Sequence, residues 1–151
     1  YILLAVSLST LSRILAEEGN YASDIPDLII ELAKDEIEKI QNYNTFLFAR
    51  YYVDLLEALG NTALFLQYSN VRRSILLEVA YMMTRIARTY ENIPLVHYYA
   101  LIQALRFYLL IGTDDARMKA LEIIGTLKRE AAPLICTAAD KIFKRYSKQE
   151  S

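Results

Sequence analysis

Residues 94–112, PLVHYYALIQALRFYLLIG, decide the fold class of this 151-residue chain. Pro94 stands inside the start of the run and Gly112 just past its end, the asymmetry typical of a helix. Apolar side chains cover nearly every face of the segment, with Gln103 and Arg106 as polar exceptions. A helix that is apolar all round is buried on several sides. We therefore expect this segment to form the centre of a helical core.

Proline and glycine mark the ends of apolar runs along the rest of the chain as well. Gly19 and Gly60 follow other apolar runs, and Pro26 and Pro133 stand near the start of new runs. The short connections favour antiparallel neighbours. The sequence thus predicts an all-α fold of six to seven antiparallel helices, in a helical bundle or an α–α superhelix-like stack. The expected helices cover residues 2–18, 24–42, 45–59, 61–90 (with a break at 69–70), 94–111, 113 onward and 133–147.

Length and cysteine content bound the class of protein. A chain of this length fits one domain with a sizeable core. We expect a single all-helical domain over residues 1–151, which can be a fragment of a longer chain because Tyr1 is not a methionine. The lone Cys136 rules out an intrachain disulfide and favours a reducing compartment. The apolar opening lacks a basic start and is soon interrupted by polar residues, so we expect a soluble, cytoplasmic protein without a membrane anchor.

Charge is unevenly distributed along the chain. Residues 1–60 hold ten acidic and four basic residues, a net charge of −6. Residues 61–151 hold eight acidic and thirteen basic residues, a net charge of +5. This asymmetry predicts surfaces of opposite sign, through which the chain can associate with itself or with a charged partner.

One stretch, residues 113–140, carries a family resemblance. It opens with Asp114-Asp115-Ala116-Arg117, continues with Ala120-Leu121 and Ile124-Gly125-x-Leu127, and then reaches Ala132-Pro133-Leu134-Ile135. This pattern resembles one HEAT/armadillo-type helical repeat. The rest of the chain lacks the arginine and the glycine at matching positions and shows no fixed period. The resemblance implies a stacked helical-hairpin scaffold that binds proteins.

The residues that commonly carry chemistry are sparse. His97 is the only histidine, and its sequence neighbours offer no nucleophile or orienting carboxylate, so we interpret it as structural. Cys136 is interpreted as a buried, inert thiol, because one cysteine and one histidine cannot supply a zinc site. No glycine-rich phosphate loop is present. The sequence therefore predicts no enzyme activity, no catalytic residues, no cofactor and no metal.

Basic stripes are the clearest candidates for an interaction site. Lys141, Lys144, Arg145 and Lys148 follow one another at i, i+3, i+4 and i+7, on one face of the last expected helix. Lysines near a helix C-terminus also complement the helix dipole, which is the plain structural alternative. The functional alternatives are a contact with phosphates or with an acidic protein surface. A second candidate stripe, on the segment 61–90, contains Tyr81, Arg85 and Arg88 next to Glu78.

An acidic face lies on the second expected helix. Glu31, Asp35 and Glu38 share one side, and Lys34 and Lys39 flank them. We interpret this face as solvated and keep it as a candidate interaction surface, because the flanking lysines neutralise it and oppose metal binding.

The function that these observations favour is a non-enzymatic protein–protein interaction domain, either a scaffold or a small helical subunit. Its partner would be another protein or a second copy of the chain. The alternative is an accessory subunit of a nucleic-acid-processing complex that contacts phosphates through the basic C-terminal half. The identity of the partner, the pathway and the oligomeric state do not follow from the sequence.

Overall fold

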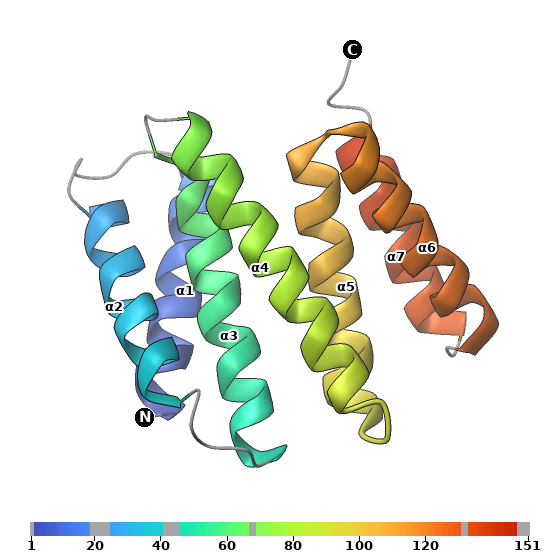
Figure 1. Cartoon of the computed structure of the whole chain (residues 1–151), viewed down its shortest axis with the longest axis horizontal. Coiled ribbons are helices and arrows are strands. Elements are labelled where there is room, and N and C mark those ends of the chain that lie inside the picture. Colours follow the sequence, from blue (N-terminus) through green and yellow to red (C-terminus); the bar gives the residue numbers. More distant parts are fainter. Residues whose placement is uncertain (1, 19–24, 41–45, 67–68, 131–132, 148–151) are drawn as a thin grey trace. The chain divides into compact units, whose positions relative to one another are not determined.

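The computed structural model describes residues 2–18, 25–40, 46–66, 69–130 and 133–147. Within these ranges the chain forms seven α-helices and no strand (Figure 1), which confirms the all-α prediction. Connected helices run in opposite directions within each part of the chain. The helices are α1 (Ile2–Glu18), α2 (Ile25–Ile40), α3 (Phe46–Ala63), α4 (Ser69–Thr89), α5 (Pro94–Ile111), α6 (Asp114–Glu130) and α7 (Pro133–Ser147).

The chain divides into two compact units, residues 1–79 and 80–151, with the boundary inside α4. The sequence had predicted a single domain over residues 1–151. Each unit has its own buried apolar side chains, such as Leu55 in the first and Leu105 in the second. The first unit holds eleven acidic and six basic residues, and the second holds seven and eleven. Their formal charges are therefore −5 and +4, so the charge asymmetry of the sequence follows the structural division.

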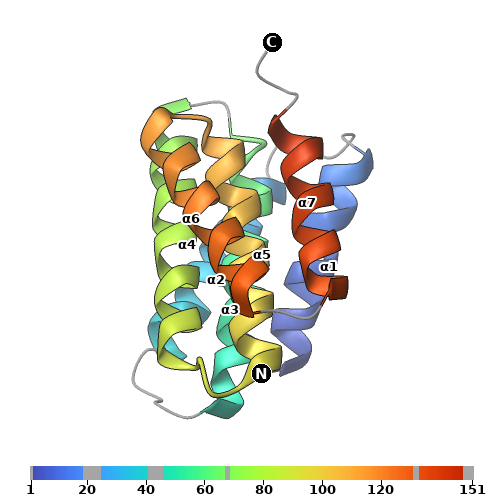
Figure 2. The ribbon, with the colours of Figure 1, turned by 90° about the vertical axis from the view of Figure 1, so that its right-hand side faces the viewer.

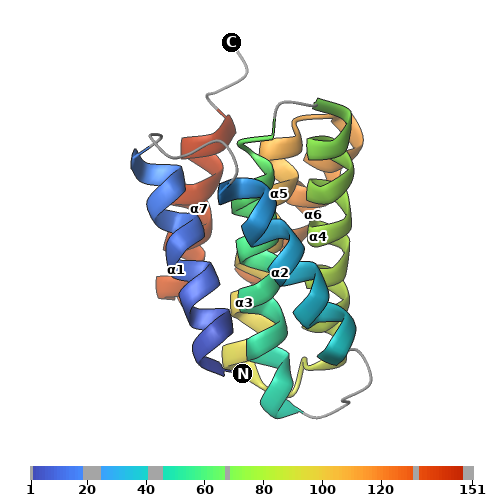
Figure 3. The same cartoon turned by 90° about the vertical axis from the view of Figure 1, so that its left-hand side faces the viewer.

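Helix α3 is the central element of the first unit. It packs against both α1 and α2 (Figure 3). Residues 53–63 of α3 are buried without interruption. This burial on several sides explains why α3 carries apolar residues around its circumference, whereas α1 and α2 expose polar faces.

The predicted boundary at Gly60 is wrong. Helix α3 continues through Gly60 to Ala63, residues 64–66 lie outside any helix, and α4 begins at Ser69. Glycine inside a helix costs about 1 kcal/mol relative to alanine, which tertiary packing overrides here. Asn61 and Thr62, which lie at the expected start of the next helix, are instead buried in the last turn of α3.

Helix α5 is the central element of the second unit and packs against α6 and α7 (Figure 2). Leu105 is fully buried at its middle, as predicted. Gly112 ends the helix in the left-handed conformation, with a φ of 72°, and its N–H donates to the carbonyl of Tyr108. Among the described residues, α5 is the one helix long and apolar enough to cross a membrane. A core helix meets the same criterion, and much of α5 is buried.

Candidate functional site

Helix α6 forms where the sequence supplies the right charges and a cap. Thr113 precedes the helix, and its hydroxyl accepts a hydrogen bond from the N–H of Ala116 at 3.3 Å. Acidic residues occupy the first turn and basic residues the last turn, which complements the helix dipole. One face of the helix is buried in the second unit through Ala116, Ala120, Ile123, Ile124 and Leu127.

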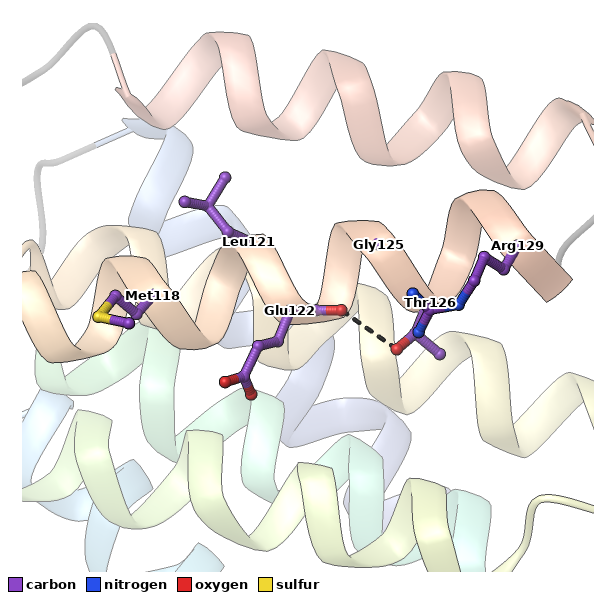
Figure 4. Close-up of a pocket in the computed structure, with 6 residues that line it drawn as sticks. All are labelled: Met118, Leu121, Glu122, Gly125, Thr126 and Arg129. Carbon is purple, nitrogen blue, oxygen red and sulfur yellow. Dashed lines mark hydrogen bonds between the residues drawn. The ribbon is translucent and has the colours of Figure 1, made fainter.

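The other face of α6 carries large apolar side chains that the chain leaves exposed. Met118 is 63% exposed and Leu121 is 53% exposed. Both line a shallow, open groove along the helix, which Figure 4 shows. We call this the α6 groove; its lining residues are Met118, Leu121, Glu122, Gly125, Thr126 and Arg129.

Gly125 lies in the middle of the α6 groove. Its φ is not positive, so the backbone does not require glycine there. A Cβ atom added at Gly125 would meet only the guanidinium of Arg129, at 3.8 Å, which is ordinary contact distance. Glycine therefore weakens α6 by roughly 0.5–1 kcal/mol relative to alanine. Packing within the described residues gives no reason for this cost.

Two opposite charges stand at either side of Gly125 on the same face. Glu122 and Arg129 are both exposed, and neither makes an ion pair within the part of the chain that the structure describes. Seven residues of helix separate their Cα atoms by about 10 Å along the helix axis. Thr126 is satisfied locally, since its hydroxyl donates to the carbonyl of Glu122 at 3.1 Å.

The basic stripe of α7 is exposed where the structure describes it. Lys141, Lys144 and Arg145 all face solvent, while Lys148 lies outside the described residues. The Arg145 guanidinium stands 5.6 Å from the centre of the Tyr146 ring. Neither lysine makes an ion pair with another described residue. The three cations therefore remain available to an external anion.

The candidate residues on α4 and α2 are also exposed. On α4 these are Tyr81, Arg85 and Arg88, and on α2 they are Glu31, Asp35 and Glu38. An ion pair of 3.0 Å joins Asp35 to Lys39. Hydrogen bonds from Lys39 to Asp35 and to Glu36 raise the pKa of the lysine. The acidic face is thus partly neutralised by its own helix.

His97 and Cys136 make contacts that tie helices together in the second unit. The Nδ1–H of His97 donates to the carbonyl of Ala87 on α4 at 2.7 Å, and its ring stands edge-on to Tyr98. The Cys136 thiol donates to the carbonyl of Leu127 at 3.3 Å. Cys136 lies on α7 and is half-buried, whereas the sequence predicted a fully buried thiol.

The first unit contains a buried polar network that was not predicted from the sequence. Glu57 on α3 is nearly fully buried and accepts two hydrogen bonds from Arg13 on α1, at 2.8 and 3.0 Å. The hydroxyl of Ser9 donates to the same carboxylate at 3.3 Å. One turn away, Asn61 donates to the hydroxyl of Ser12 at 3.3 Å. The polar residues of α1 that seemed to interrupt an apolar run are therefore partners of α3.

Two further acids are buried in the first unit, one on α2 and one on α3. Glu36 on α2 accepts a 2.8 Å hydrogen bond from the hydroxyl of Tyr51. Asp54 accepts from the Nε of Arg50 at 3.4 Å. Burial raises the pKa of Asp54 and the nearby Glu57 raises it further, while Arg50 lowers it. The bond between Tyr51 and Glu36 joins α3 to α2, whereas Arg50 and Asp54 pair within α3. Neither contact lines the α6 groove.

Metal sites and relatives add no further candidate. Within the described ranges, no three histidine, cysteine or acidic residues come close enough to hold a metal ion. No family model, no curated protein and no solved structure matches the chain. The α6 groove and the basic stripe of α7 are therefore the two candidate binding surfaces. One feature of the sequence could have indicated the exposed apolar side chains of α6. This helix carries more apolar residues than one buried face needs.

Proposed function

We propose that this chain is a non-enzymatic protein–protein interaction module that presents helix faces to another protein chain. The α6 groove carries the proposal. Helix α6 already buries one face in its own unit, yet Met118 and Leu121 remain more than half exposed on the other. Contiguous exposed apolar surface commonly marks a protein-binding site. The resemblance of residues 113–140 to a HEAT/armadillo-type repeat supports the same class of function.

Site-specific photo-crosslinking tests this proposal. A photoreactive phenylalanine analogue replaces Met118, and the matched control places it at Asp27, an exposed position on α2. We expect a defined protein adduct in cells at position 118 and none at position 27. Equal labelling at both positions, or no adduct at 118, would contradict an interaction through α6.

A second candidate function rests on the α7 stripe. Exposed cations without protein partners attract phosphates, so the chain can serve as an accessory subunit of a nucleic-acid-processing complex. If Lys141, Lys144 and Arg145 each neutralise one phosphate of a duplex, the logarithm of the affinity should fall with the logarithm of salt with a slope of about −2.7. Fluorescence anisotropy with a labelled duplex measures this slope. Binding that is unchanged by salt, or by Lys144→Glu, would exclude this function for the stripe.

The cellular location belongs to the same proposal. The single thiol of Cys136 suits a reducing compartment, and we place the module in the cytoplasm.

A further inference from the structure

We propose that the partner of the α6 groove is a second copy of this chain. The two α6 helices would cross antiparallel, with a twofold axis passing between Gly125 and Thr126. This inference rests on the proposed function, because it identifies the protein that the α6 groove binds.

The charges of the α6 groove are self-complementary. Glu122 and Arg129 lie on one face with Gly125 and Thr126 midway between them. A twofold axis at that midpoint brings Glu122 of each copy opposite Arg129 of the other. An isologous contact therefore forms both ion pairs at once. A parallel arrangement in register would instead oppose like charges, which disfavours it.

The shape of the α6 groove suits a helix crossing at the same point. Gly125 presents no side chain, and a Cβ atom added there would meet only the flexible Arg129 side chain, at 3.8 Å. Small residues at a crossing allow two backbones to approach closely, so that flanking side chains can touch. Leu121 of one copy would then lie beside the methylene groups of Arg129 of the other. This close approach accounts for a glycine that the single chain does not need.

The size of the contact indicates a weak dimer. Helix α6 has 17 residues and is about 25 Å long. One face of such a helix buries less than the roughly 800 Å² per partner of a standard stable interface. We therefore expect an equilibrium between monomer and dimer that depends on concentration.

Charge exchange across the twofold axis tests the geometry. Sedimentation velocity of the full chain over a concentration series measures the dissociation constant. We expect Glu122→Arg alone and Arg129→Glu alone each to raise it by about tenfold, because every dimer loses two ion pairs and gains two repulsions. The double variant Glu122→Arg/Arg129→Glu should restore the dimer, since each copy again offers both charges. Failure of the double variant to recover association, with a normal thermal melt, would overturn the antiparallel arrangement.

Two further variants separate this contact from other modes of association. Lys144→Glu on α7 changes the net charge by as much as Arg129→Glu and should leave the dissociation constant unchanged. Gly125→Ala should raise the melting temperature of the monomer, because alanine favours the helix and its Cβ meets only the Arg129 side chain at ordinary contact distance, and it should still weaken the dimer. Gly125→Ala with unchanged dimerisation would overturn a close crossing at this position.

The crosslinking experiment distinguishes failure of this inference from failure of the proposed function. A chain that is monomeric at every concentration, yet yields an adduct with a different protein at position 118, overturns the dimer and retains the interaction module. A monomeric chain without such an adduct overturns both. An adduct at twice the mass of the chain, lost in Glu122→Arg and regained in the double variant, supports both.

Discussion

Leu105 shows how one side chain can test the core of the second unit. It has no exposed surface at the middle of α5. We expect Leu105→Ala to lower the free energy of unfolding by about 2–5 kcal/mol, through lost burial and the cavity left behind. Chemical denaturation measures the change. Leu95→Ala is a matched control on the same helix, because Leu95 is 84% exposed and should change stability by no more than about 0.5 kcal/mol. Equal effects at the two positions would show that α5 is not central.

Asp54 gives a pH-dependent prediction at the residue scale. Burial holds its pKa above the ordinary value of 3.8. In the window between the ordinary and the raised pKa, the folded state binds more protons than the unfolded state. This group therefore favours folding at low pH, and that contribution is lost as the pH rises through the raised pKa. At neutral pH the buried charge destabilises the fold.

We accordingly expect Asp54→Asn to be more stable than the parent chain at pH 7. The difference should shrink as the pH falls and vanish once Asp54 is protonated in both states. Urea unfolding at a series of pH values measures it. The amide oxygen can still accept from Arg50, so the hydrogen bond is kept. An Asp54→Asn variant that is less stable at pH 7 would show that attraction to Arg50 outweighs desolvation.

At the scale of elements, the contact between α1 and α3 depends on an arginine at the surface. The Arg13 side chain is 51% exposed, but the Glu57 side chain that it binds is only 3% exposed. Removing Arg13 leaves a buried carboxylate with Ser9 as a remaining hydrogen-bond donor. We expect Arg13→Ala to cost about 2–3 kcal/mol in unfolding free energy, more than an exposed arginine normally contributes.

Two comparisons make this prediction specific. Arg88→Ala on α4 removes an equally charged, exposed side chain and should cost less than about 0.5 kcal/mol. Adding Glu57→Gln to Arg13→Ala should recover part of the loss, because a buried amide is less costly than a buried charge. A loss for Arg13→Ala no larger than for Arg88→Ala would mean that Glu57 reaches water without its partner.

At the scale of the whole molecule, charge is divided between the two units as −5 and +4. We expect the chain to bind a cation-exchange resin at low salt despite its net charge of −1. Reversing Lys144 and Arg145 to Glu should abolish this retention, because both residues are exposed on the positive unit. The attraction should weaken with salt, since the screening length is about 8 Å at physiological ionic strength. Absence of retention in the parent chain would show that the opposite charges neutralise each other locally.

The same reversal separates two modes of self-association. Association of the acidic unit of one copy with the basic unit of another would weaken in this double variant. The antiparallel contact through the α6 groove would not, because Lys144 and Arg145 lie on α7.

The sequence by itself determined the helical class and the centre of the second unit. Apolar spacing and terminal residues act within a few turns of the chain, so Pro94, Gly112 and the burial of Leu105 could be predicted locally. The position of the break between α3 and α4 could not be predicted locally. The free-energy cost of Gly60 inside a helix is offset by packing with residues distant in the sequence. Gly60 locally favours a helix end, but α3, packed against α1 and α2, continues past it.

Tertiary structure alone decided which polar residues are buried and which apolar residues are exposed. Ser9 and Arg13 read as interruptions of an apolar helix, yet they meet Glu57, more than 40 residues away. Leu121 belongs to the repeat-like pattern of residues 113–140, yet it lines an open groove together with Met118. Helical periodicity indicates which residues share a face. Which segment covers that face depends on the packing of segments that are distant in the sequence. For the α6 groove we propose that this partner is a second copy of the chain.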